Sequence, residues 1–295
     1  MFSEKYLAGF VDADGHLSVR ARIGARPDLE LQVVQRTTHA DVLFYAHELF
    51  DGHMDTSHEG LYTRLSLRGG PARKAFERLK KYLVLKRDQA ERFLDLVDCS
   101  VVLKTEGDVK AVRQRVKEIR AYGATHEPNF PARKWMAGYV DGDGSFAVKV
   151  CKKTGYAYPS LVILAAPNYF VGITLLHKAF GGQLQAMGQN AVWAVSLSQP
   201  SKIKQVLGHF AQYLVLKKPQ AYFLLGCAER GNLRDGEAIH RTIKALNAQQ
   251  HRLSDPAAEA ARFVQEVRFD VPTRPLGRPK GVIELQPRRK RQSAP

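Results

Sequence analysis

Two short acidic sequences have the residue types and spacing of a metal-dependent hydrolytic site. Asp12-Ala13-Asp14-Gly15 and Asp141-Gly142-Asp143-Gly144 each place two carboxylates two residues apart, just before a glycine. Mg²⁺ prefers carboxylate and carbonyl oxygens, and a pair of metal ions can activate water while stabilising the leaving oxygen of a phosphodiester. A single copy would equally suit a calcium-binding loop or a plain turn. The presence of two copies favours a hydrolytic site.

Each acidic sequence ends a ten-residue repeat. Tyr6 to Gly15 and Trp135 to Gly144 both begin with an aromatic residue and continue with apolar and small residues, at an offset of 129 positions. Two helices built from these repeats can approach closely, because their central Ala-Gly pairs carry almost no side chain. The residues expected at this contact are Leu7, Ala8, Gly9, Val11, Met136, Ala137, Gly138 and Val140.

Pairing these helices about a pseudo-two-fold axis would bring Asp14 and Asp143 side by side. The two carboxylates would repel each other, and each would lie at the negative end of a helix dipole. A divalent cation between them removes both penalties, so the pairing itself favours a metal site.

A second repeat follows further along each half. Tyr82 to Lys86 and Tyr213 to Lys217 share the sequence Tyr-Leu-Val-Leu-Lys, and each is followed at the same spacing by Gln-Ala. Repeats this far apart are typical of two small domains in tandem. We expect one domain at 1–99, a connector with a helix at 100–133, a second domain at 134–230, helices at 231–268 and a basic, flexible tail at 269–295.

Alternation of apolar and polar residues predicts strands after each acidic sequence. His16 to Ile23 places Leu17, Val19, Ala21 and Ile23 on one face, and Leu29 to Val33, Leu61 to Arg68 and Phe146 to Val150 alternate similarly. Pro71 and Pro200 are placed to open helices. The expected fold is α+β, with an antiparallel sheet in each half that is covered by helices on one face and free on the other.

The doubled ten-residue motif resembles the defining motif of the LAGLIDADG homing endonucleases, in their single-chain form with two motifs. The resemblance covers roughly residues 1–98 and 130–226. It implies two pseudo-symmetric αββαββα domains whose sheets form a saddle over double-stranded DNA. It also implies a monomer that cuts one phosphodiester in each strand across the minor groove, with two or three Mg²⁺ ions bound and Mn²⁺ able to substitute.

The same resemblance assigns roles to individual residues. The second acidic residue of each motif, here Asp14 and Asp143, is the metal ligand in that family, assisted by the main-chain carbonyls of Ala13 and Gly142. The first acidic residues, Asp12 and Asp141, are expected to be structural. Lys86 and Lys217 match a basic residue near each scissile phosphate, which can stabilise the developing negative charge.

Gln35 matches a family position that orients a water molecule. An offset of about 130 positions leads to Leu164-Ala165-Ala166-Pro167, which contains no polar side chain, and Asn168 is the nearest alternative. We therefore expect two unequal sites.

DNA contacts are expected from the polar faces of the strands, because Arg pairs with guanine and Gln with adenine in the major groove. The candidates are Arg20, Arg22, Glu30, Gln32, Tyr62, Arg64, Arg68, Lys149, Lys152, Lys153, Gln183, Gln185 and Gln189. The halves share few of these residues, which predicts a non-palindromic target.

The composition agrees with a nucleic-acid partner. The 295 residues are 44% hydrophobic, enough for two modest cores, and the formal net charge of +16 favours a polyanion. No apolar run is long enough for a membrane span, and the N-terminus lacks a signal segment, so an intracellular protein is expected. Cys99, Cys151 and Cys227 show no paired ligand spacing, which argues for a reducing compartment and against a zinc site.

Two other functions remain open at this point. Some members of the family act as RNA-splicing maturases, which would make RNA a partner. A non-catalytic DNA-binding regulator of the same fold is expected to have lost one of the second aspartates, whereas Asp14 and Asp143 are both present. An intein is disfavoured, because neither end of the chain has the residues of protein splicing.

Overall fold

The computed structural model describes residues 2–57, 59–122, 132–165, 169–187, 192–230 and 235–248. The predicted contact residue Gln189, the alternative Asn168 and the tail at 269–295 lie outside these ranges. The first half consists of α1 (Glu4–Asp14), β1 (Gly15–Arg20), β2 (Asp28–Arg36), α2 (Asp41–Phe50), β3 (His53–Thr56), β4 (Tyr62–Arg68), α3 (Gly70–Leu79), α4 (Arg87–Asp98) and α5 (Glu106–Ala121). A short 3₁₀ helix, η1 (Thr37–His39), precedes α2.

The second half repeats this order. It consists of α6 (Arg133–Asp143), β5 (Gly144–Val150), β6 (Ala157–Ala165), α7 (Phe170–Phe180), β7 (Gln183–Met187), β8 (Val192–Leu197), α8 (Pro200–Phe210), the 3₁₀ helix η3 (Ala211–Tyr213), α9 (Lys218–Arg230) and α10 (Gly236–Ala248). Each half therefore has the predicted α+β order, αββαββα, followed by two more helices. None of the described helices is long and apolar enough to cross a membrane.

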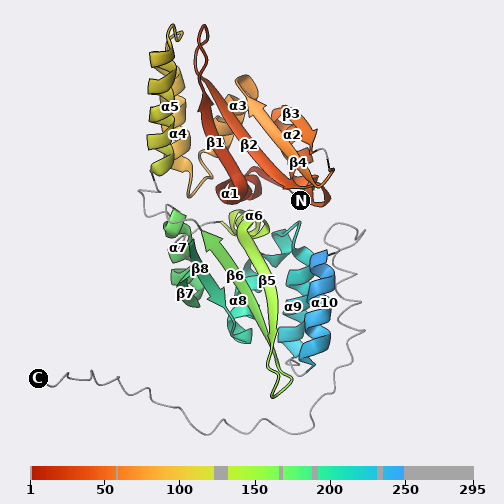
Figure 1. Cartoon of the computed structure of the whole chain (residues 1–295). Helices are drawn as coiled ribbons and strands as arrows, with labels where there is room; N and C mark the ends of the chain where they lie inside the picture. The colour runs from red at the N-terminus through yellow and green to blue at the C-terminus, as the bar shows by residue number, and fades with distance from the viewer. Residues whose placement is uncertain are drawn as a thin grey trace, which may run out of the picture.

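Each half contains one four-stranded antiparallel sheet. The strand orders are β1-β2-β4-β3 and β5-β6-β8-β7, which are equivalent. Figure 1 shows the strands of both sheets in front of α2, α3 and α8, with α1 and α6 lying between the two halves. The apolar residues of the strands, such as Leu17, Leu31 and Ile163, are buried against the helices. We call the opposite side of each sheet, which the described helices leave uncovered, its open face.

The last helix of each half covers the edge of its own sheet. Arg120 on α5 donates from Nε to the carbonyl of Leu17 on the edge strand β1, at 3.3 Å. Asn247 on α10 donates to the carbonyl of Phe146 on the edge strand β5, at 3.3 Å. These contacts satisfy carbonyls that an edge strand would otherwise expose. The helix of the predicted connector thus packs as an integral element of the first half.

The structure departs from the predicted strands at their ends. β1 ends at Arg20, and Ile23 lies in the following turn, 53% exposed. The prediction that Ile23 belongs to the buried face is therefore wrong, and Arg22 is not on a strand. β4 begins at Tyr62, which leaves Leu61 exposed before it. Pro71 and Pro200 do lie in the first turns of α3 and α8, as predicted.

Candidate active site

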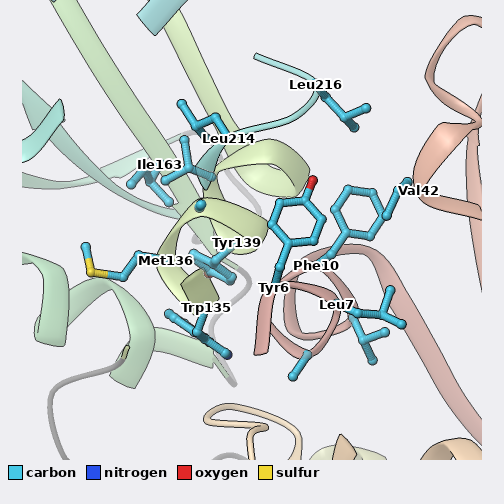
Figure 2. Close-up of a cluster of buried hydrophobic side chains, with 14 of the residues drawn as sticks. Tyr6, Leu7, Phe10, Val42, Trp135, Met136, Tyr139, Ile163, Leu214 and Leu216 are labelled. Atoms are coloured by element: carbon cyan, nitrogen blue, oxygen red, sulfur yellow. The ribbon is translucent and has the colours of Figure 1, made fainter. Parts of the chain in front are cut away.

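The site is built on the contact between α1 and α6. A Cβ atom added to Gly9 would lie 1.9 Å from the carbonyl oxygen of Trp135, and one added to Gly138 would lie 1.9 Å from that of Tyr6. Only glycine permits this approach of the two backbones, so each helix requires a glycine where it meets the other, Gly9 in α1 and Gly138 in α6. Figure 2 shows Leu7 and Met136 pointing away from the contact in opposite directions, so these two predicted contact residues pack into their own halves.

Each motif helix also bonds to the other through its first aromatic residue. The hydroxyl of Tyr6 donates to Asp141 at 2.7 Å, and the indole Nε1 of Trp135 donates to Asp12 at 2.8 Å. All four residues are buried. Hydrogen bonds to a buried carboxylate are among the stronger ones in proteins, so they fix the register between the halves.

Asp12 and Asp141 anchor the second repeat, in agreement with their expected structural role. Asp12 accepts from the backbone N–H of Val84 at 2.7 Å and of Lys86 at 2.8 Å. Asp141 accepts in the same way from Val215 at 2.7 Å and Lys217 at 2.9 Å. Burial raises the pKa of both carboxyls, and these hydrogen bonds together with the nearby lysine oppose that shift.

Lys86 and Lys217 are thereby placed at the C-terminal ends of the motif helices. The ammonium of Lys86 donates to the carbonyls of Val11 and Gly15, both at 2.8 Å, and to Ala13 at 3.3 Å. That of Lys217 donates to the carbonyls of Val140, Asp141 and Gly142 at 3.0, 2.6 and 2.9 Å. Cations at this end of a helix offset its dipole. Burial lowers the pKa of both lysines, and the surrounding aspartates oppose that shift.

Asp14 and Asp143 lie close together where the two helices end. A Cβ added to Gly142 would be 3.0 Å from Oδ2 of Asp14, so the second motif directly faces this carboxylate. Burial, followed by the charge of Asp14, raises the pKa of Asp143 to about 6. Burial also raises the pKa of Asp14. Burial destabilises the charged form of both carboxylates, and Asp14 further destabilises that of Asp143, which a bound cation would relieve.

The lysines act across the pseudo-symmetry. Lys217 is the cation that lowers the pKa of Asp14 most, and Lys86 has the larger effect on Asp143. The aromatic ring of Tyr169, from the second half, lies 5.2 Å from the Lys86 ammonium. Each half therefore contributes a cation to the environment of the other half's aspartate.

The donor set fits a divalent ion only if main-chain oxygens take part. Among the described residues no three His, Cys, Asp or Glu side chains group as a metal site. Asp14 and Asp143 provide two carboxylates, and the carbonyls of Ala13 and Gly142 lie beside them. Both carbonyls accept a lysine hydrogen bond, and a carbonyl oxygen has a second lone pair available.

Gln35 makes the two aspartates unequal. Its Nε2 donates to Oδ2 of Asp14 at 2.6 Å. The equivalent sheet registers, Gly15 with Val33 and Gly144 with Ile163, make Ala165 the counterpart of Gln35. Ala165 is buried and has no polar atom in its side chain. Within the described part of the chain, no side chain donates a hydrogen bond to Asp143.

Most of the predicted DNA contacts lie on the open faces or at their rims. In the first sheet Arg20, Glu30, Gln32, Tyr62, Arg64 and Arg68 alternate with the buried residues, whereas Arg22 extends from the turn beyond β1. In the second, Lys149, Gln183 and Gln185 lie on strands, and Lys152 and Lys153 lie in the turn between β5 and β6. The two sheets lie on either side of α1 and α6, the helices that end in Asp14 and Asp143 (Figure 1).

The structure adds residues that the sequence did not single out. Tyr6 and Trp135 were predicted only as aromatic positions of the repeat. The signal that could have identified them is the single O–H or N–H donor that each carries beside an apolar ring. Acidic partners of the predicted arginines, Asp28 and Asp55, were also missed, because cross-strand pairing depends on the register.

Comparison with known proteins agrees with these features. Residues 136–228 match the model of the LAGLIDADG endonuclease family. The chain is similar to the LAGLIDADG homing endonuclease I-GzeII, solved in complex with its DNA target, at 17% identity and a TM-score of 0.60, over 91% of this chain and 99% of that one. The meganuclease I-AabMI bound to uncleaved DNA gives 18% identity and a TM-score of 0.61, over 90% and 99%.

A third solved structure, the homing endonuclease I-SmaMI bound to cleaved DNA, has 17% identity and a TM-score of 0.61, over 86% of this chain and 99% of that one. At such identities the similarity shows the fold. No curated protein sequence matches the chain significantly. The family model therefore matches the second half of the chain, and the solved structures share the fold of both halves.

Proposed function

We propose that the chain is a site-specific DNA endonuclease that makes a double-strand break at a long, non-palindromic target. The observation that carries the proposal is the joining of Asp14 and Asp143, one from each half, at the end of the α1–α6 contact. One carboxylate from each half suits one cut in each strand of a duplex.

The substrate is double-stranded DNA. The open faces of the two sheets lie on either side of the aspartates and carry arginine, lysine and glutamine side chains. A sheet ribbon fits the major groove, and the net charge of +16 favours a polyanion. The three similar solved structures described above are complexes with DNA. I-GzeII is bound to its DNA target, I-AabMI to uncleaved DNA and I-SmaMI to cleaved DNA.

Asp14 and Asp143 would hold Mg²⁺, together with the carbonyls of Ala13 and Gly142, in two or three positions that Mn²⁺ can also occupy. The bound metal supplies an activated water and stabilisation of the leaving oxygen. Gln35 orients Asp14 by its 2.6 Å hydrogen bond. Lys86 and Lys217 keep positive charge beside both aspartates, where negative charge develops on the phosphate during hydrolysis.

Differences between the halves account for a non-palindromic target and for unequal strand cleavage. Gln35 has Ala165 as its counterpart, so the surroundings of Asp14 and Asp143 differ. The residues of the two open faces also differ at most equivalent positions. A single chain supplies both halves, so the protein acts as a monomer with pseudo-two-fold symmetry.

Cleavage of a randomised duplex library by the purified chain tests the proposal. The library is incubated with Mg²⁺, with EDTA, or with Mg²⁺ and the Asp14→Asn variant, and the cut ends are sequenced. We expect cuts at one long asymmetric sequence, with short 3′ overhangs, only for the wild type in Mg²⁺. Binding of one sequence without cutting would favour the regulator, and no selection of DNA would favour the RNA-splicing maturase.

A further inference from the structure

Three arginines on the open face of the first sheet are paired with carboxylates. Arg20 on β1 lies 3.9 Å from Asp28 on β2, and Arg68 on β4 donates from Nε to Glu30 on β2 at 2.9 Å. Arg64 on β4 donates from Nε to Asp55 on β3 at 3.0 Å, and its Nη2 bonds to the second oxygen of that carboxylate. One ion pair thus joins each pair of adjacent strands.

The second sheet has none of these pairs. The equivalent registers give Lys149 and Tyr158 in place of Arg20 and Asp28, and Gln185 and Ala194 in place of Asp55 and Arg64. Glu30 and Arg68 correspond in the same way to Ser160 and Ser198, the latter just beyond β8. No carboxylate occupies any of these six positions.

A carboxylate that holds an arginine changes what the arginine can bind. The paired guanidinium is fixed in orientation, and its remaining N–H groups can donate to O6 and N7 of guanine. The carboxylate accepts from the amino group of cytosine and repels phosphate. Such a pair therefore favours a G·C base pair and disfavours non-specific attachment to the backbone.

The open face of the second sheet carries amide and aliphatic side chains without such ion pairs, and the first sheet also has an amide and an aliphatic side chain, Gln32 and Val34, at the positions equivalent to Val162 and Leu164. Gln183 and Gln185 carry amides, which pair with adenine. Leu164 and Val162 lie on the same face of β6, and Leu164 is 37% exposed. Exposed aliphatic side chains can contact the methyl group of thymine. Lys149 lies on the same face and can pair with guanine, so what this surface lacks is an arginine held by a carboxylate.

We propose that the first half selects G·C base pairs through carboxylate-held arginines, a means of selection that the second half lacks. Asp55 and Glu30 are positioning residues for this selection, since they act through Arg64 and Arg68. The proposal rests on the proposed DNA-binding function and names the class of target that goes with it.

Binding selection from a randomised duplex library, carried out in EDTA with the full chain, tests this inference. The wild type is compared with Asp55→Asn and Glu30→Gln, which keep the side-chain size and remove the charge. Gln185→Ala is the matched control, because it alters the position in the second sheet equivalent to Asp55. Thermal unfolding of each variant confirms that it folds.

We expect the wild type to enrich a site with guanines fixed in the half that the first sheet contacts. Asp55→Asn and Glu30→Gln should each reduce guanine preference at one position by about 5- to 100-fold, and raise affinity for unselected DNA. Gln185→Ala should change preference only in the other half.

An enriched site with no fixed guanine in the half that the first sheet contacts would overturn the inference while leaving the proposed function intact. Unchanged guanine preference in both Asp55→Asn and Glu30→Gln would overturn it as well. So would a change of preference by these two variants in the half of the target that Gln185→Ala affects. If the wild type enriches no duplex at all, the proposed DNA-binding function itself fails.

Discussion

Lys86 and Lys217 illustrate how one side chain can serve both the fold and the site. Their ammonium groups donate to main-chain carbonyls at the ends of α1 and α6, and their charges act on the aspartates of the opposite half. The role beside the scissile phosphate stays a prediction. The hydrogen bonds of the two lysines to main-chain carbonyls are a separate, structural role, and their contribution to stability can be measured without DNA.

Replacing Lys86 by methionine tests that structural part. The substitution keeps the aliphatic chain and leaves the carbonyls of Val11 and Gly15 without their donor. The free energy of unfolding should fall by about 2 kcal/mol, measured by chemical denaturation. Lys149→Met, at an exposed position on β5, should change it by less than about 0.5 kcal/mol. Equal stability of the two variants would contradict the account of Lys86.

Gln35 provides a second test at the residue scale. Gln35→Ala removes the 2.6 Å hydrogen bond to Asp14, whereas the second half already has alanine at the equivalent position. Loss of this orientation should slow cleavage of one strand by about 10²-fold and leave the other nearly unchanged. Time courses with each strand separately end-labelled measure both rates. Equal slowing of the two strands would show that Gln35 does not serve a single site.

At the scale of elements, the α1–α6 contact depends on the two glycines. Gly9→Ala would put a Cβ 1.9 Å from the Trp135 carbonyl oxygen, and neither backbone can yield without moving its half. We expect a loss of about 3 kcal/mol in the free energy of unfolding, from thermal or chemical denaturation. Gly208→Ala, on α8 with nothing within 4 Å of the added Cβ, is the control and should be neutral or stabilising by up to about 1 kcal/mol. A Gly9→Ala protein as stable as the control would contradict the described contact.

The sequence predicted the elements better than the contacts between them. Alternation located the buried residues of β1 and β2, and Pro71 marked the start of α3, because these signals are local. Gly9 was predicted at the helix contact and lies there. Leu7 was also predicted there, whereas Tyr6 makes the contact, because the orientation of a helix that is apolar on all sides cannot be inferred from periodicity. Ile23 was misplaced because the strand ends where the turn begins.

At the scale of the molecule, the duplication in the sequence was sufficient to predict two equivalent halves. One cluster of buried residues runs through both halves, so they are parts of one folded unit. The packing of α5 and α10 on their sheet edges could not be predicted, because it depends on long-range contacts such as that of Arg120 with Leu17. The ion pairs across the first sheet were missed for the same reason.

The central claim is that one aspartate from each half is needed for a double-strand break. A supercoiled plasmid that carries the selected target is incubated with the wild type, Asp14→Asn, Asp143→Asn or the double variant, and nicked and linear products are quantified. We predict linear product from the wild type in Mg²⁺ and none in EDTA, and none from any of the variants, although all bind the target as the wild type does. Linear product from either single variant at the wild-type rate would contradict the claim.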